Sequence, residues 1–445
     1  MVRNALAVVR QPGSPDEEPG DLWCDSGQVV PPLTAIGADT EVLDAMGCIV
    51  TPGLVNAHHH LLQTAFRTLP GTRGVPMAQW LPTMAAAYRA AGIDEELTHA
   101  AAAAALTESL LSGVTTVADH QLVWPPAGDD AALAAAVDAA SRAVGTRLVF
   151  VRGSAGDDPQ AAAAGAEAVA GRLLGPAGRS PAGVSGDGRT QVAVGPAGVH
   201  SDSAETFRLL GQVAERLGLR RRTQANEQVD VAVAATRYGR RPVELLAEWG
   251  WLAPDVTLAH LCAVTEAEIE RLAAGGVSGT HAPGCDLPMG WGVAPVAALR
   301  EAGVVMGLGT SGGGSNDAGH LLADARLAMQ VAALAPIRPR PLAAREVLAM
   351  ATSGSALGLG RPELGHLRPG AAADLCVWDV SGVADAGVAD PVAGLLWADP
   401  GRRPRHVVVA GRVVVRDGVP VAVTAQHAGD ELRRVLQVRG GAARP

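Results

Sequence analysis

Short apolar runs rich in β-branched residues alternate with longer alanine-rich stretches through the middle of the chain. The apolar runs have the length of buried strands, and the alanine-rich stretches have the length of helices. Eight runs predict strands, at residues 48–60, 113–120, 147–153, 191–198, 219–226, 256–262, 276–283 and 304–310. Helices are expected at residues 99–111, 130–143, 204–217 and 265–274. Eight strands that alternate with helices predict an α/β fold, a (β/α)8 TIM barrel.

The two ends of the chain carry a different pattern of short valine-rich strands and turn residues. Within residues 406–423, the tripeptides Ala-Gly-Arg and Arg-Asp-Gly interrupt the valine runs as hairpin turns do. We expect residues 1–52 and 361–445 to pair into one small β-sandwich domain, beside a barrel domain of residues 53–360. The segments rich in alanine, glycine and proline are expected to be loops, at residues 126–129 and 175–188.

Composition excludes several classes of protein and of chemistry. The chain has 445 residues, 48% of them hydrophobic, which is enough for a large barrel and a smaller domain. A net charge of −9 argues against a nucleic-acid partner, and no apolar run is long enough to predict a membrane span. The N-terminal residues lack an export signal and the five cysteines are scattered, so we expect a reduced, cytoplasmic protein. All 36 basic residues are arginine, which excludes a lysine Schiff base.

Polar residues follow several predicted strands, at the end of the barrel where active sites form. His58 and His60 share one face of the first strand, where they either bind one metal ion or form a polar strand end. His260 and His281 end the sixth and seventh strands, and each alone is also compatible with a structural histidine. Glu227 follows the fifth strand, where a carboxylate serves either as a proton shuttle or as a helix N-terminal residue.

The glycine-rich turn at residues 309–317 follows the eighth strand. Its glycines are compatible with a close approach of the backbone to a ligand. They are equally compatible with a flexible loop before a helix that Ser315 or Asp317 caps. The sequence leaves these two interpretations open.

Long motifs occur in order along nearly the whole chain. They are DAMGCIVTPGLVNAHHHLLQT, SGVTTVADH, LAHLCAVTEAEIERLAAGGVSGTHAPGCDLPMGWGVAPV, GLGTSGGGSNDAGHLLADARLA and LRPGAAADLCVWD. Together they resemble the amidohydrolase superfamily, most closely its branch of 8-oxoguanine deaminases and triazine hydrolases. The resemblance implies one bound Zn²⁺ or Fe²⁺ ion, a small heterocyclic substrate, and a homodimer or larger homo-oligomer. The implied reaction is hydrolytic deamination or dechlorination of a nitrogen heterocycle by metal-activated water.

The resemblance also implies roles for residues at matching positions. His58 and His60 match metal ligands of the family, and His260 is a further candidate ligand. Glu227 and His260 match the residues that handle the protons of the attacking water. Gln63 and His281 match residues that contact the substrate.

Two positions depart from the family pattern. The motif HTHLAE reads RTQANE here, so Gln224 replaces a metal histidine and Arg222 replaces the earlier histidine. The motif GTDG reads GTSG, so Ser311 stands in place of a metal-binding aspartate and becomes a candidate catalytic residue. These losses predict a metal affinity lower by orders of magnitude. Arg222 and Gln224 point into the barrel as candidate substrate-binding residues, and Arg222 either grips an anionic substrate or forms a structural ion pair.

Three functions remain open at this stage. The first is a metal-dependent hydrolase that acts on carbon–nitrogen or carbon–chlorine bonds of cyclic amidines. The second is a metal-independent enzyme in which Glu227, the histidines and Arg222 perform acid–base chemistry, such as condensation, rearrangement or cyclisation. The third is a non-catalytic relative, although the retained glutamate and histidines favour an enzyme.

Overall fold

The computed structural model describes residues 1–33, 37, 40–125, 128–175 and 181–440. Parts of the two expected loops, residues 126–127 and 176–180, lie outside the described residues. No helix within the described part of the chain is both long and apolar enough to span a membrane.

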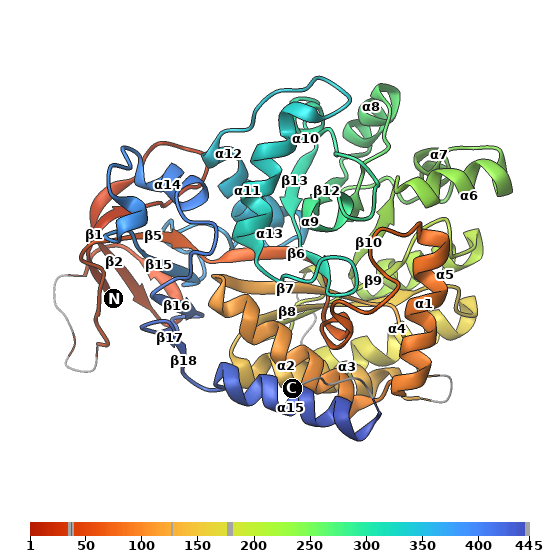
Figure 1. The fold of residues 1–445 in the computed structure, drawn as a ribbon, viewed down its shortest axis with the longest axis horizontal. Coiled ribbons are helices and arrows are strands. Elements are labelled where there is room, and N and C mark those ends of the chain that lie inside the picture. The colour runs from red at the N-terminus through yellow and green to blue at the C-terminus, as the bar shows by residue number, and fades with distance from the viewer. Residues whose placement is uncertain (34–36, 38–39, 126–127, 176–180, 441–445) are drawn as a thin grey trace.

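A closed ring of parallel strands forms the centre of the molecule (Figure 1). In chain order the strands are β6 (Leu54–His60), β7 (Val114–Gln121), β8 (Arg147–Ser154), β9 (Thr190–Pro196), β10 (Arg220–Ala225), β11 (Val256–His260), β12 (Ser278–His281), β13 (Val305–Leu308) and β14 (Ser311–Gly312). β13 and β14 are two parts of one strand position, and β14 pairs with β6 so that Ser311 lies opposite His59. This pairing closes the sheet, which confirms the predicted (β/α)8 barrel.

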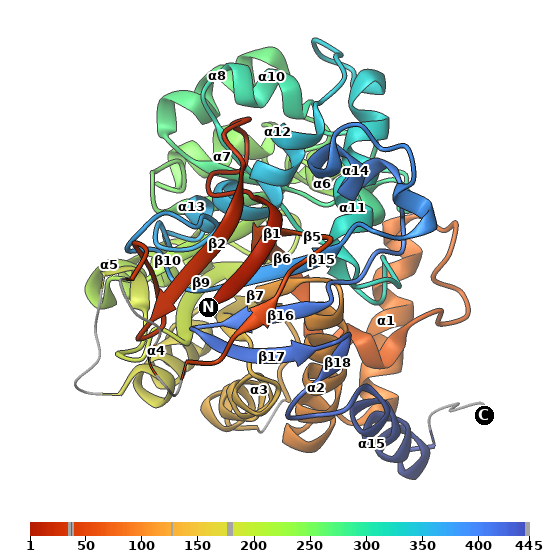
Figure 2. The ribbon, with the colours of Figure 1, turned by 90° about the vertical axis from the view of Figure 1, so that its left-hand side faces the viewer.

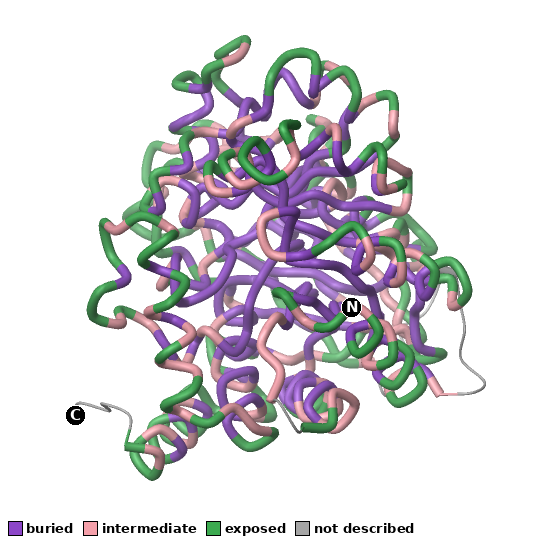
Figure 3. Tube along the Cα trace, turned by 90° about the vertical axis from the view of Figure 1, so that its right-hand side faces the viewer, coloured by how far each residue is buried: buried purple, intermediate pink, exposed green. Residues whose placement is uncertain are grey.

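Helices surround the ring and connect its strands. The four predicted helices are found as α2 (Glu95–Leu111), α3 (Asp130–Val144), α5 (Ala204–Leu217) and α8 (Glu266–Gly275). The remaining barrel helices are α1 (Met77–Ala91), α4 (Pro159–Leu174), α6 (Gln228–Tyr238), α7 (Pro242–Glu248), α9 (Pro283–Asp286), α10 (Val296–Glu301), α11 (Leu321–Val331), α12 (Ala344–Ala349) and α13 (Ser355–Gly358). Local sequence explains where they begin: Thr265 and Glu268, for example, form a capping box at the start of α8. Figure 3 shows buried central strands and outer helices that expose one side.

The predicted strand at residues 48–60 is divided between two sheets. Its first part is β5 (Cys48–Pro52), which belongs to the sheet of the chain ends, and its second part is β6 of the barrel. Gly53 lies at the junction, where a Cβ atom would come within 2.3 Å of the Thr115 side chain. The chain changes sheets here because only glycine fits against β7.

Both chain ends pair into one mixed sheet, as predicted (Figure 2). Its strands are β1 (Val2–Val8), β2 (Glu18–Asp25), β3 (Gln28–Val30), β4 (Leu43–Asp44), β5, β15 (Leu375–Asp379), β16 (His406–Val409), β17 (Arg412–Arg416) and β18 (Val419–Pro420). β5 and β15 pair antiparallel and so join the two ends. Both predicted hairpins are present, because β17 pairs antiparallel with β16 and with β18. In the turn between β16 and β17, Ala410 and Gly411 both have positive φ.

The C-terminal region also adds helices to the barrel side of the molecule. α14 (Pro391–Trp397) packs near α11 and α12, and α15 (Ala425–Val438) lies along α2 (Figure 1). Arg434 and Arg439 near the end of α15 form ion pairs with Glu96 and Asp94, at 2.9 Å and 2.7 Å. The domain boundaries at residues 52 and 360 stay predictions.

A buried ion pair connects the barrel to the sheet of the chain ends. Arg147 of β8 donates from Nε and Nη2 to the two carboxylate oxygens of Asp374, at 2.7 Å and 2.9 Å. We expect Arg147→Ala to lower the free energy of unfolding by about 3–5 kcal/mol, since it leaves a buried carboxylate without its partner. Urea unfolding measures the change, and Arg208→Ala, which removes an exposed pair, serves as the control. Equal losses in the two variants would contradict this view of the interface.

Candidate active site

Four histidines from three strands converge inside the carboxyl-terminal end of the barrel. His58 and His60 come from β6, His120 from β7 and His260 from β11, and all four are buried. The ring centroid of His58 lies 4.8 Å from that of His60, 5.1 Å from that of His260 and 6.0 Å from that of His120. The strand-end rule thus places together three histidines that the sequence singled out, and it adds His120, which ends the second strand in the same way.

In two of these rings, hydrogen bonds show that Nδ1 carries a proton. Nδ1 of His60 donates to the carbonyl oxygen of His120 at 2.7 Å, and Nδ1 of His260 donates to Oδ1 of Asp286 at 2.7 Å. In metal sites, a ligating histidine typically donates its second ring nitrogen to a carbonyl or carboxylate in this manner. Nε2 of His58 is buried and has no hydrogen-bond partner among the described residues. A metal ligand would show this orientation and an unsatisfied nitrogen of this kind, and the assignment of His58 and His60 as ligands stays a prediction.

Gln224 lies beside this cluster with its amide oxygen directed at His260. Its Nε2 donates to the carbonyl oxygen of Ala197 at 3.2 Å, which leaves Oε1 3.1 Å from Nε2 of His260. Oε1 of Glu227 is 3.6 Å from the same nitrogen. Two oxygens and one imidazole nitrogen thus face each other, an arrangement that a cation between them stabilises.

Glu227 occupies the N-cap position of α6, but its side chain makes no capping hydrogen bond. The residue is 1% exposed, and neither carboxylate oxygen has a hydrogen-bond partner within the described chain. Burial raises the pKa of Glu227, and the nearby His260 opposes this shift. Of the two interpretations left open by the sequence, the geometry favours the proton shuttle.

Asp286 organises the two histidines that follow the sixth and seventh strands. It ends the short helix α9, accepts from His260, and lies 3.4 Å from Nδ1 of His281 through its second oxygen. Burial would raise the pKa of Asp286, but the charge of His260 and its hydrogen bond to Oδ1 hold it at about 2. The strand-end rule does not find Asp286, because this residue follows its strand by five positions, in the short helix α9.

Backbone strain accompanies the site. His260 and Leu261 have φ values of 76° and 59°, Asn226 has 57° and Ser311 has 56°. Each such non-glycine residue costs on the order of 1–3 kcal/mol and persists only where the surroundings impose it. The strain lies at the ends of strands five, six and eight, which are the positions that present the site residues.

Arg222 points into the barrel but has no carboxylate partner among the described residues. Its guanidinium donates to the carbonyl oxygen of Ala57 on β6, and Nη1 is buried without a partner. Burial lowers the pKa of Arg222 to about 9. The ion pair that the sequence left open for Arg222 is therefore not found among the described residues. Its guanidinium instead places a positive charge near the histidine cluster.

The glycine-rich turn after strand eight packs tightly against Gln63. A Cβ atom on Gly312 would come within 2.1 Å of Oε1 of Gln63, and the same oxygen accepts from the backbone N–H of Gly314 at 3.1 Å. The following helix, α11, is capped by His320, so capping by Ser315 or Asp317 is not observed. The glycines thus allow close packing around a polar side chain of the cavity.

A cavity of about 610 Å³ opens above the histidines. Its walls include flat and flexible apolar side chains, among them Trp80, Met84, Tyr88, Trp124, Met289 and Trp291. Polar groups on its surface include His60, Gln63, Gln224, Cys285 and Ser311. Arg222 and His281 are not part of this lining, and their substrate-binding roles stay predictions. Aromatic walls with few polar groups suit a flat heterocyclic ligand.

His200 also lines the cavity and pairs with Asp230, its Nδ1 2.9 Å from Oδ1. Burial lowers the pKa of His200, but the hydrogen bond and charge of Asp230 outweigh this and raise it to about 9. This pair should therefore stabilise the fold fully below the unfolded pKa of about 6.5 and lose that contribution as pH rises through about 9. We expect a loss of about 1–3 kcal/mol, measured by urea unfolding across this range. His200→Gln should flatten the dependence of the unfolding free energy on pH, whereas the control His427→Gln, at an exposed position, should leave it unchanged. The same pH dependence in the wild type and in His200→Gln would contradict this prediction.

A family comparison decides the classification of the chain. The model of the amidohydrolase family matches residues 49–414, which is most of the sequence. The chain belongs to the amidohydrolase family. This confirms the resemblance inferred from the motifs.

Related proteins of this family include deaminases and a chlorohydrolase. The 8-oxoguanine deaminase of Pseudomonas aeruginosa is 33% identical over 436 residues, which cover 94% of each chain. A 5-methylthioadenosine/S-adenosylhomocysteine deaminase of Halobacterium salinarum is 33% identical over 88% of this amidohydrolase and 87% of the relative. The zinc complex of atrazine chlorohydrolase from Arthrobacter aurescens superimposes with a TM-score of 0.87 at 33% identity, over 98% and 99% of the chains.

Proposed function

We propose that this amidohydrolase removes an amino or chloro substituent from a nitrogen heterocycle by hydrolysis, with the help of one bound Zn²⁺ or Fe²⁺ ion. The observation that carries the proposal is the convergence of three imidazoles and one unpartnered buried carboxylate below an aromatic cavity. Relatives that are deaminases or a zinc-complexed chlorohydrolase support it. Such an ion, when bound, lowers the pKa of water and so supplies a nucleophile near neutral pH.

The residues present fit a divalent ion. Two imidazoles on one zinc ion, with bonds of about 2.0–2.1 Å at a tetrahedral angle, have ring centroids about 5 Å apart. The centroid distances from His58 to His60 and to His260 are 4.8 Å and 5.1 Å. These two distances place His58 between the other two rings of the proposed site, in which His58, His60 and His260 would hold the ion; the amide oxygen of Gln224 lies 3.1 Å from Nε2 of His260. Ser311 adds no negative charge, which is consistent with weaker binding than an aspartate gives.

Glu227 is positioned to move the proton. Its carboxylate lies next to Nε2 of His260, so it can accept a proton from the attacking water and deliver it to the departing amine or chloride. Asp286 holds His260 in place through Nδ1. Trp80 and Trp291 would contact the faces or edges of the heterocycle, and Gln63 offers an amide to its ring atoms. Exclusion of bulk water by these walls strengthens each polar contact.

Release of ammonia or chloride from a panel of aminopurines, aminopterins and chlorotriazines tests the proposal. Purified protein should release one of these products when Zn²⁺ or Fe²⁺ is present, lose the activity on chelation and regain it when the metal is restored. Turnover that survives complete removal of metal would contradict the proposal.

One observation favours a second candidate, metal-independent acid–base chemistry. Both ring nitrogens of His260 face oxygen acceptors, Asp286 Oδ1 at 2.7 Å and Gln224 Oε1 at 3.1 Å. An imidazolium satisfies both contacts without a metal ion, and Arg222 adds a second positive charge nearby. Under this candidate, turnover is unchanged by chelation and is lost in His260→Gln.

A further inference from the structure

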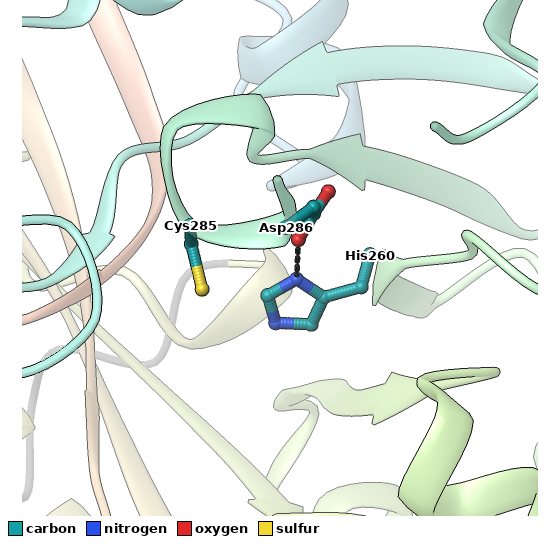
Figure 4. A group of neighbouring side chains, drawn as sticks. All are labelled: His260, Cys285 and Asp286. Atoms are coloured by element: carbon teal, nitrogen blue, oxygen red, sulfur yellow. Dashed lines mark hydrogen bonds and ion pairs between the residues drawn. The ribbon is translucent and has the colours of Figure 1, made fainter. Parts of the chain in front are cut away.

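Cys285 lies in the wall of the cavity, beside the site of the missing aspartate. It belongs to α9, directly before Asp286, and it is buried. One donor atom each from His260, Cys285 and Asp286 lie within 4.8 Å of one another. Figure 4 shows the thiol of Cys285 to one side of the imidazole ring of His260. A soft sulfur donor is thus close to the cluster of imidazole nitrogens.

The same thiol is next to Ser311, which stands where the family has its metal-binding aspartate. Burial and the charge of Asp286 raise the pKa of Cys285, and the nearby hydroxyls of Ser315 and Ser311 oppose this shift. These two hydroxyls are 3.5 Å apart, and both line the cavity together with Cys285. The sulfur therefore lies on the side of the site where an anionic ligand is lacking.

The position of Cys285 matters because the other proposed ligands of the ion carry no negative charge. Three neutral imidazoles and an amide oxygen offer no negative charge to a divalent ion, and Arg222 adds a cation below them. Thiolate is among the strongest ligands of zinc, and sites with two cysteines and one histidine also occur in catalytic zinc proteins. A bound ion deprotonates a coordinating thiol, so the buried thiol becomes an anion only when metal is present.

We propose that Cys285 binds the metal ion as a thiolate and replaces the anionic ligand that Ser311 no longer supplies. This inference rests on the proposed function, because it assumes that the ion binds at His58, His60 and His260. A second observation points to a ligand next to His260, to which Cys285 is also close: Nε2 of His58 is buried, has no partner among the described residues and belongs to a ring 5.1 Å from that of His260. Binding releases the thiol proton to solvent, and no electron is transferred.

Cobalt substitution tests the proposal without relying on activity. The full-length protein is loaded with Co²⁺ alone, bound cobalt is quantified, and the near-ultraviolet absorption is recorded. The wild-type protein should show a thiolate-to-cobalt charge-transfer band. Cys285→Ser should lose that band and bind cobalt at least about tenfold more weakly, by analogy with the loss of supporting ligands in metal sites.

Two further variants make the test specific. Cys262→Ser is the matched control, because Cys262 is also buried and lies near Asp286 but does not line the cavity; it should keep the band. The double variant Cys285→Ser with Ser311→Asp should regain cobalt affinity without the band, since it restores a carboxylate at position 311. Bound cobalt without a charge-transfer band in the wild type would overturn the role of Cys285 alone. Failure of the wild type to bind cobalt would overturn both this role and the proposed function.

Discussion

Replacing Glu227 by glutamine is expected to lower kcat by about 10²–10⁴-fold, the contribution typical of a positioned general acid or base. The substitution keeps the shape of the side chain but removes its ability to accept a proton. Both carboxylate oxygens lack partners among the described residues, so no structural hydrogen bond is lost with the charge. The measurement is the initial rate on the substrate found by ammonia or chloride release, with KM determined in parallel.

The control for this variant is Glu270→Gln, because Glu270 is exposed on α8 and does not line the cavity. Its kcat should match that of the wild type. Bound metal should remain in Glu227→Gln, since the residue is assigned to proton transfer and not to metal binding. Unchanged turnover in Glu227→Gln would contradict the mechanism.

Replacing His58 by alanine is expected to remove the metal ion and the activity together. One of only three imidazole donors is lost, and neither Gln224 nor Ser311 can supply a comparable ligand. The fall in metal affinity should exceed the 10–100-fold that is roughly typical of losing a supporting residue outside the coordination sphere. Competition with a chromophoric chelator measures the affinity, and circular dichroism establishes that the barrel remains folded.

His427→Ala is the matched control for the loss of an imidazole. His427 is exposed on α15, which lies along α2 on the outside of the barrel (Figure 1), and its replacement should leave metal content unchanged. Equal metal content in His58→Ala and wild type would contradict the assignment of His58 as a ligand.

The barrel could be predicted from sequence because most of its strands carry a local signal. β-branched residues mark β7, β8, β9 and β11, the alternation with helices places β10 and β12 between them, and the Ala410–Gly411 turn marks the hairpin of β16 and β17. The interruption of strand eight could not be predicted in this way. At Gly309 a Cβ atom would come within 2.7 Å of His58, so the break arises from contact with a strand more than 240 residues earlier.

The convergence of His58, His60 and His260 also followed from sequence, since parallel strands of a barrel end at one face. Asp286 and Cys285 could not be found by that rule. They lie in α9, beyond the end of β12, where side-chain direction depends on tertiary packing. Nor could sequence show that Gln224 directs its oxygen at His260, because the hydrogen bond to Ala197 fixes the amide.

The metal content of the purified wild-type protein tests the central claim most directly. Elemental analysis after expression with added Zn²⁺ or Fe²⁺, followed by dialysis, should find about one zinc or iron ion per chain, held by the three imidazoles. His58→Ala prepared in parallel should contain none. Wild-type protein that is folded, active and free of metal would contradict the account and leave the imidazolium of His260 as the source of positive charge.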